Sequence, residues 1–310
     1  MFSVQAMNIS VIDSAAGIRH VLNQTPHERA EAVRDLWAPM AGMYHFIPGL
    51  DMLGVHAQNF GFPLDMSLQS EQRVCEAIVA LEVANAWTRV RTALQEGAAA
   101  LAAGDPGIPV PDLQVLLLAG DPTNHHFMDE IQGLSAFGGI SGYISMTVWP
   151  TEQVLDRLEA IAVHELHHNV RYSPGGVVWD PVTVTVGEHV VAEGLADLFA
   201  AELYGDRGYT HFASEHTRSD DAVLTKVASG LRVTGMADFA AWVLGDASAS
   251  LFGGEPVGLP TGAGYAAGAR IVQAYLDATG TSAAQNARTP ASDILAVALP
   301  ALDLNDTGAH

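Results

Sequence analysis

A five-residue segment, His164-Glu165-Leu166-His167-His168, restricts the possible structure of this chain more than any other part of the sequence. It fits the pattern H-E-x-x-H, and from a predicted N-cap at Thr151 onward the apolar residues have helical spacing. On a helix the side chains of residues i and i+4 lie on one face, so His164 and His168 can bind the same metal ion. Glu165 is one position further round, where its carboxylate can reach a water molecule on that ion. The segment therefore predicts a zinc-binding helix with Glu165 as a general base.

The histidine pair has one alternative, because residues i and i+3 also share a helix face. His164 could pair with His167 in place of His168. The pair His164 and His168 is preferred, since only that pair completes the pattern. Two histidines are too few in either case, because catalytic zinc is usually held by three protein ligands and a water.

The third ligand is expected on the segment Glu193-Gly194-Leu195-Ala196-Asp197, in a second predicted helix over residues 187–204. Glu193 and Asp197 share one face of a helix that is otherwise largely apolar, where two carboxylates are unusual. Both are explained if Glu193 is a ligand and Asp197 accepts a hydrogen bond from a ligand imidazole. His189, four residues before Glu193, is an alternative ligand.

At these residues the chain resembles the gluzincin-type zinc metallopeptidases, and more closely the family of predicted zinc-dependent proteases labelled DUF2268. The resemblance rests on H-E-L-H-H at 164–168, E-G-L-A-D at 193–197, G-Y-I-S at 142–145 and G-Y-A-A-G at 264–268. It implies a zincin-like fold, hydrolysis of peptide bonds and one zinc ion per chain, held by His164, His168 and Glu193. It also implies that Glu165 is the base and that Asp197 lies behind the metal.

Peptide hydrolysis would also require a hydrogen-bond donor that stabilises the oxyanion. Tyr265 is the candidate, because Gly264 and Gly268 allow a close approach of substrate near the start of a predicted helix. Tyr172 and His211 are the alternatives.

The pattern of apolar and turn-forming residues predicts an α+β fold that is mainly helical. We expect a mainly helical portion over residues 1–110, then a zincin-like metal-binding portion over residues 111–310 that ends in further helices. The second portion should contain a small sheet edged by a strand at 140–149, directly before the histidine helix and after a loop at 120–139. An extended peptide could add antiparallel to that strand.

The charge of the chain narrows its possible partners. It has 14 Lys and Arg residues against 35 Asp and Glu, a net charge of −21, which disfavours binding to nucleic acid or an anionic membrane. No apolar run approaches the roughly 18 residues of a membrane-spanning helix, and no signal peptide is evident, so we expect a cytoplasmic protein. The expected partner is a peptide or a small amide-containing substrate, and the sequence leaves the oligomeric state open.

Two other functions fit the same residues. A zinc enzyme could act on a small metabolite by amide hydrolysis or lyase chemistry, because a fold does not determine a reaction. A non-catalytic regulator could instead hold the metal as a structural element. A closed site with four protein ligands would indicate a structural metal. A narrow pocket would indicate a metabolite substrate, and an open groove beside the strand would indicate a peptide substrate.

Overall fold

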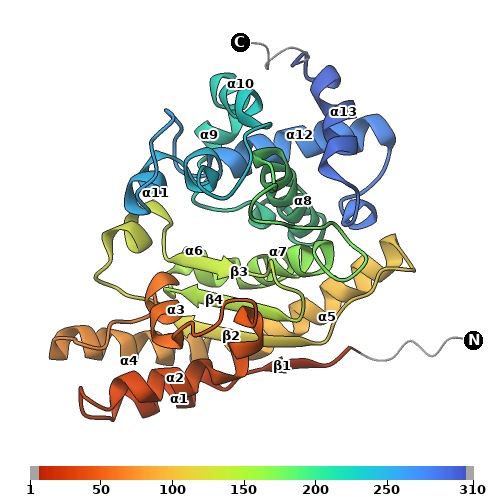
Figure 1. The fold of residues 1–310 in the computed structure, drawn as a ribbon. Coiled ribbons are helices and arrows are strands. Elements are labelled where there is room, and N and C mark those ends of the chain that lie inside the picture. The colour runs from red at the N-terminus through yellow and green to blue at the C-terminus, as the bar shows by residue number, and fades with distance from the viewer. Residues whose placement is uncertain (1–6, 305–310) are drawn as a thin grey trace, which may run out of the picture. The chain divides into compact units, whose positions relative to one another are not determined.

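The computed structural model describes residues 7–304 and is mainly helical with a small mixed sheet, so the predicted fold class is confirmed (Figure 1). The strands are β1 (Ile9–Val11), β2 (Leu113–Ala119), β3 (Leu134–Phe137) and β4 (Tyr143–Val148). The helices up to the histidine segment are α1 (Ser14–Leu22), α2 (Arg29–Trp37), α3 (Met52–Gln58), α4 (Leu68–Val83), α5 (Ala86–Gly104), α6 (Glu152–Asp156) and α7 (Leu158–Arg171). The later helices are α8 (Val186–Tyr204), α9 (Glu215–Ser219), α10 (Asp221–Gly230), α11 (Asp246–Leu251), α12 (Ala263–Thr279) and α13 (Ala291–Ala301).

The chain divides into two compact units. The first runs to Ala98 and includes Pro109–Asn169, and the second comprises Ala99–Ile108 and the chain from Val170 onward. The boundary that we predicted near residue 110 is a different division of the chain, and it stays a prediction.

The sheet belongs to the first unit and has the strand order β1-β2-β4-β3 (Figure 1). β1 is parallel to β2, with Ile9 opposite Leu113, and β2 is parallel to β4, with Val115 opposite Ile144. β2 is a nearly continuous apolar segment, which is typical of a parallel strand buried on both faces.

The prediction that the strand at 140–149 edges the sheet is wrong. β4 lies between β2 and β3, and the edge is β3, which pairs antiparallel with β4 from Leu134 opposite Val148 to Phe137 opposite Ser145. β3 falls within the segment 120–139 that we expected to be a loop. Its four residues are flanked by Gly133 and Gly138, so it is too short to show a strand's alternation of apolar and polar residues.

Helix α7 is supported by α5 within the first unit. Arg89 of α5 makes a bidentate ion pair with Glu159 in the first turn of α7, at 2.6 Å for each nitrogen–oxygen pair. Further along α5, a Cβ atom on Gly97 would lie 2.9 Å from Cγ1 of Val163, so the absence of a side chain there lets the two helices pack closely. These contacts set the position of the helix that carries the histidines.

Helix α8 is the central helix of the second unit, and nearly all of its residues are buried. It crosses α12 at two glycines: a Cβ atom on Gly194 would overlap the carbonyl oxygen of Gly268, and one on Gly268 would overlap that of Val190. The backbones of the two helices are therefore in direct contact at Gly194, between the positions of Glu193 and Asp197.

Candidate metal centre

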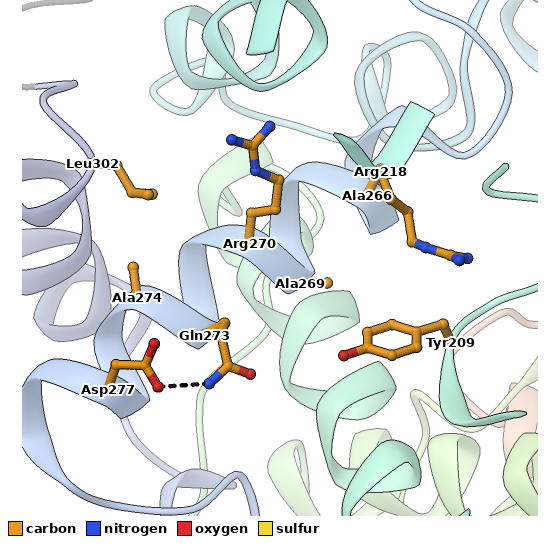
Figure 2. Close-up of a pocket in the computed structure, with 9 residues that line it drawn as sticks. All are labelled: Tyr209, Arg218, Ala266, Ala269, Arg270, Gln273, Ala274, Asp277 and Leu302. Carbon is orange, nitrogen blue, oxygen red and sulfur yellow. Dashed lines mark hydrogen bonds between the residues drawn. The ribbon is translucent and has the colours of Figure 1, made fainter. Parts of the chain in front are cut away.

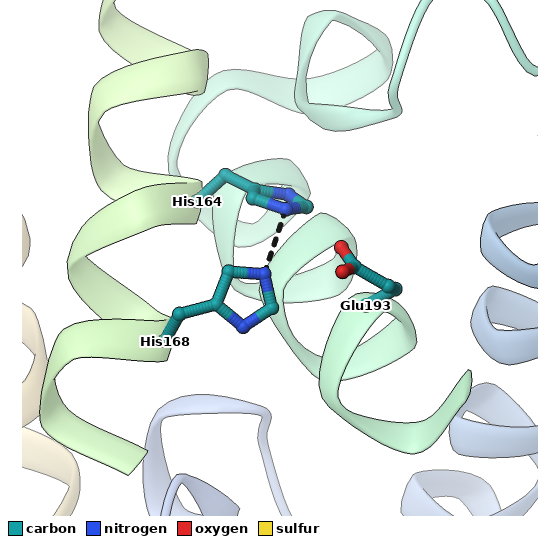
Figure 3. Close-up of side chains that lie close together, drawn as sticks. All are labelled: His164, His168 and Glu193. Atoms are coloured by element: carbon teal, nitrogen blue, oxygen red, sulfur yellow. Dashed lines mark hydrogen bonds between the residues drawn. The ribbon is translucent and has the colours of Figure 1, made fainter. Parts of the chain in front are cut away.

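Helix α7 presents His164 and His168 on one face, as the spacing predicts. Their Nε2 atoms are 3.0 Å apart, and their rings meet edge to face at a centroid distance of 4.8 Å (Figure 3). Thr151 is an N-cap, since its hydroxyl accepts a hydrogen bond from the backbone N–H of Val154 at 3.2 Å, but the prediction that it caps the histidine helix is wrong. That cap begins α6, and the chain turns at Arg157 before α7 begins.

Helix α8 has the predicted ends. The Thr185 hydroxyl caps its N-terminus by accepting from the backbone N–H of Glu188 at 3.0 Å, and Gly205 ends it with a φ of +62°. The apolar residues around this helix bury its carboxylates as well as its alkyl side chains, including Glu193 and Asp197.

His164, His168 and Glu193 each offer one ligand atom, and these atoms all lie within 4.8 Å of one another (Figure 3). In the described part of the chain, residues 7–304, this is the group of three His, Cys, Asp or Glu side chains that could hold a metal ion. The alternatives His167 and His189 are not members of it.

The donor set of this group fits zinc. Two imidazole nitrogens and one carboxylate oxygen are ordinary zinc ligands, and three protein ligands leave a fourth position for water or substrate. With metal–ligand bonds of about 2.1 Å, tetrahedral coordination separates ligand atoms by about 3.4 Å. The 3.0 Å between the two Nε2 atoms is close to that spacing.

The end of strand β3 lies against the turn of α7 that contains Glu165. A Cβ atom on Gly138, the residue after β3, would overlap the carbonyl oxygen of Glu165. Only a glycine allows the backbone of the edge strand to come this close to the helix.

Asn169 fixes the loop between β3 and β4 to the histidine helix. Its side-chain nitrogen is 3.0 Å from the carbonyl oxygen of Gly138, and 2.8 Å from those of Ile140 and Tyr143. Its side-chain oxygen accepts from the backbone N–H of Gly142 at 2.8 Å. Asn169 was not among the residues predicted from the sequence, although an amide directly after the H-E-x-x-H segment of a largely apolar helix could have suggested such a role.

A buried ion pair joins the end of α7 to the start of α8. The Arg171 guanidinium is fully buried and donates to both oxygens of Glu188, at 2.7 and 2.8 Å. Its remaining nitrogen, Nη1, donates to the carbonyl oxygens of Ala287 and Thr289 at 3.1 and 2.9 Å. Sequence patterns do not identify such a pair, because a lone arginine near a helix end more often reaches solvent.

The three candidates for the oxyanion donor have different surroundings. Tyr172 donates its hydroxyl hydrogen to Glu188 at 2.9 Å, and burial, followed by the Glu188 charge, raises the pKa of its phenol well above the ordinary value. Tyr265 lies in the first turn of α12, and its ring packs edge to face on Phe212 at 5.3 Å. His211 is buried and contacts Phe212 as well, with ring centroids 5.9 Å apart. The Tyr172 hydroxyl donates to Glu188 in this arrangement, and the oxyanion role of Tyr265 stays a prediction.

Asp197 accepts two hydrogen bonds from one residue. The hydroxyl of Thr210 donates to Oδ1 at 2.8 Å and the backbone N–H of Thr210 donates to Oδ2 at 3.2 Å. The carboxylate is almost completely buried. It is therefore held in a fixed orientation one helical turn after Glu193.

Breaking the Arg171–Glu188 pair should destabilise the protein by about 3–5 kcal/mol, because either substitution leaves a buried charge without its partner. Urea unfolding of Arg171→Met and Glu188→Gln would measure this. Arg34→Met is the control, since Arg34 pairs with Asp51 on the surface, and it should leave the free energy of unfolding nearly unchanged. Similar small losses for Arg171→Met and Arg34→Met would mean that the buried pair contributes no more than a surface pair.

No helix in the part of the chain that the structure describes is both long and apolar enough to cross a lipid bilayer.

Comparison with known proteins gives one family and one relative. A family model described as "Predicted Zn-dependent protease (DUF2268)" matches residues 87–296, from α5 to α13. The uncharacterized protein YjfC of Bacillus subtilis (strain 168) is 34% identical over 168 residues, which make up 53% of this chain and 54% of that protein. The chain therefore spans about half the length of the curated relative that it matches. No solved structure matches the chain.

Proposed function

The chain belongs to the DUF2268 family of predicted Zn-dependent proteases, and on that basis we propose that it is a zinc-dependent hydrolase that cleaves peptide bonds. The main support is the group of His164, His168 and Glu193, whose ligand atoms lie within 4.8 Å of one another. Glu165 follows the first of these ligands directly in the sequence. Three protein ligands leave one coordination position open, which is typical of catalytic rather than structural zinc.

Zinc held by these residues would supply Lewis acidity, which activates a water molecule and polarises the carbonyl group of the substrate. In the proposed reaction Glu165 accepts the proton of the attacking water and then returns it to the leaving amine. Asp197 has an indirect role. Beyond the two hydrogen bonds from Thr210, its oxygens have lone pairs that can accept a hydrogen bond from a ligand imidazole and so fix the orientation of that ring.

The proposed substrate is an extended peptide that pairs with the outer edge of β3. In the sheet of the described residues β3 has a partner strand, β4, on one side, whereas both sides of β4 are occupied. Gly138 brings the end of this edge strand against the turn of α7 that holds Glu165. Backbone pairing along β3 would give affinity with little dependence on the sequence of the peptide.

The test is digestion of an unfolded protein, such as reduced casein, by the zinc-loaded chain, with mass spectrometry to detect new termini. We expect cleavage that stops with 1,10-phenanthroline and returns with added zinc. Failure of the zinc-loaded chain to cleave casein, combined with hydrolysis of small aryl amides, would favour a metabolite substrate. Tightly held zinc with no hydrolysis of either substrate would favour a structural metal.

Asp197→Asn should weaken zinc binding by about 10- to 100-fold, because an amide is a poorer hydrogen-bond acceptor behind a ligand imidazole. Competition with a chromophoric chelator would measure the affinity. Asp206→Asn is the matched control, since Asp206 is exposed and lies just beyond the end of α8. Equal affinities for Asp197→Asn and the wild type would remove Asp197 from the proposed site.

Tyr265→Phe should lower kcat by about 100-fold or more at unchanged zinc content, because it removes one hydroxyl and keeps the ring that packs on Phe212. Tyr275→Phe, on the same helix, is the control. The Tyr275 hydroxyl donates a hydrogen bond to Oδ1 of Asn286 at 3.1 Å, so removal of this hydroxyl should affect stability and not kcat. A normal kcat for Tyr265→Phe would transfer the oxyanion role to His211 or Tyr172.

A further inference from the structure

The second unit contains a cavity of about 380 Å³ that the proposed reaction does not use (Figure 2). It lies along α12, and residues of α9, of the loop before it and of the end of α13 complete its wall. None of the proposed metal ligands lines it.

The floor of this cavity is apolar and formed by small side chains. Ala266, Ala269 and Ala274 of α12 contribute small side chains to the lining, and Leu302 adds a larger apolar one. Alanines at these positions leave space next to the helix that a longer side chain would fill. The floor therefore fits the hydrocarbon part of a small molecule.

Two arginines line the same cavity, although the whole chain has only 14 Lys and Arg residues. Arg218 stacks over the ring of Tyr209 at 5.2 Å and donates to the carbonyl oxygen of Ala213 at 3.0 Å, which holds its guanidinium in place. Arg270 donates from Nη2 to the exposed carboxylate of Asp221 at 2.6 Å. The second terminal nitrogen of Arg270, Nη1, is shielded from solvent and has no hydrogen-bond acceptor within residues 7–304. A ligand oxygen that accepts a hydrogen bond from this guanidinium would be bound favourably, because it would satisfy a donor that has no acceptor in the described part of the chain. Rotation of the flexible arginine side chain could bring the donor and the ligand oxygen together.

The one acidic residue in the lining lies away from Arg270. Asp277 is seven residues further along α12, which places its Cα about 10 Å along the helix axis. Its Oδ1 atom accepts from the side-chain nitrogen of Gln273 at 2.8 Å (Figure 2). An anion at Arg270 would therefore not meet this carboxylate.

We propose that this cavity binds a small organic carboxylate, with the head group at Arg270 and the apolar part on the alanine floor. The planar fork of a guanidinium matches the two oxygens of a carboxylate. The proposal is independent of the peptidase function, because it uses none of the residues in the candidate metal centre.

Hexanoate is a suitable probe, with hexanamide and hexylammonium as ligands of similar length. The net charge of −21 attracts cations and repels anions over the whole surface. Non-specific binding would therefore favour hexylammonium. We expect calorimetric titration to show saturable binding of hexanoate, and binding at least tenfold weaker for the other two ligands. Absence of saturable hexanoate binding, or equal binding of hexanoate and hexanamide, would overturn the proposal.

Substitutions of residues that line the cavity test whether hexanoate binds there. Arg270→Gln should weaken hexanoate binding by about tenfold or more, the factor that a charge-assisted hydrogen bond contributes. Arg232→Gln, which removes the same charge from an exposed position, should not weaken it. Ala274→Leu should block binding by filling the cavity without changing a charge, and melting temperatures would show that each variant is folded. Unchanged affinity in both Arg270→Gln and Ala274→Leu would place the ligand elsewhere.

A carboxylate can also bind zinc, so the same titration on His164→Ala separates the two sites. Hexanoate affinity should be unchanged in this variant if the ligand occupies the cavity on α12. Loss of binding in His164→Ala would place hexanoate on the metal and overturn the proposal.

Discussion

Glu165→Gln should keep its zinc and lose peptide cleavage by about a hundredfold to ten-thousandfold. The amide has nearly the shape of the carboxylate, but it cannot accept the proton of the attacking water. The metal ligands are unchanged, so zinc content measured by elemental analysis should remain at one ion per chain. The rate would be measured as the appearance of casein termini at saturating zinc.

Glu152→Gln is the control for this substitution, because Glu152 is exposed and lies just before the histidine helix. It should retain the full rate. A zinc-loaded Glu165→Gln variant with a near-normal rate would eliminate Glu165 as the base. Such a result, together with tightly bound zinc, would favour the structural-metal alternative.

Replacing any one of His164, His168 and Glu193 with Ala should cost the protein its zinc, because two remaining ligands hold the ion poorly. Elemental analysis after dialysis should give one zinc per chain for the wild type and close to none for the three variants. Zinc bound only to the folded state also stabilises it, by about 2.7 kcal/mol when free zinc is a hundred times the dissociation constant. A chelator should therefore lower the melting temperature of the wild type and leave those of the three variants unchanged.

His167→Ala is the control for the choice of histidines. His167 is fully buried, so its loss should lower stability, but the zinc content of the folded protein should stay at one per chain. Zinc loss in His167→Ala with retention in His168→Ala would move the pair to His164 and His167. If Glu193→Ala retained zinc, His189 and Glu188 would become the candidates for the third ligand.

The two helices of the candidate centre could be predicted because their signals are local. The spacing of His164 and His168 and the end of α8 before Gly205 each depend on a few neighbouring residues, and the structure has both. The cap at Thr151 is also local, but it begins the short helix α6 and not the histidine helix. The residue pair on α8, Glu193 and Asp197, could be proposed because carboxylates are unusual in an apolar helix.

The remaining features depend on contacts between segments far apart in the sequence. The hydrogen bonds of Asn169 to the β3–β4 loop span up to 31 residues, and those of Arg171 to the segment before α13 span up to 118. No periodicity in the sequence reports such contacts. β3 was missed because a strand of four residues beside glycines carries little pattern of its own.

Cys75, on helix α4, shows the same limit. The apolar residues around it suggest a buried thiol, yet it is exposed. The buried side of α4 is formed by Val74, Ala77, Ile78 and Leu81, and Cys75 lies outside that stripe. Which of two apolar faces becomes buried is decided by the partner of a helix and not by the helix alone.

The direct backbone contact between Gly194 and Gly268 limits which amino-acid substitutions this protein can tolerate during evolution. Where large side chains separate two helices, each substitution in the core alters the gap between them by part of an ångström. Here the gap between α8 and α12 is set by main-chain atoms, so the core side chains around the crossing can be exchanged without moving the helix that holds Glu193. Sequence drift in the core should therefore be tolerated, whereas a single added methyl group at either glycine would force the two helices apart.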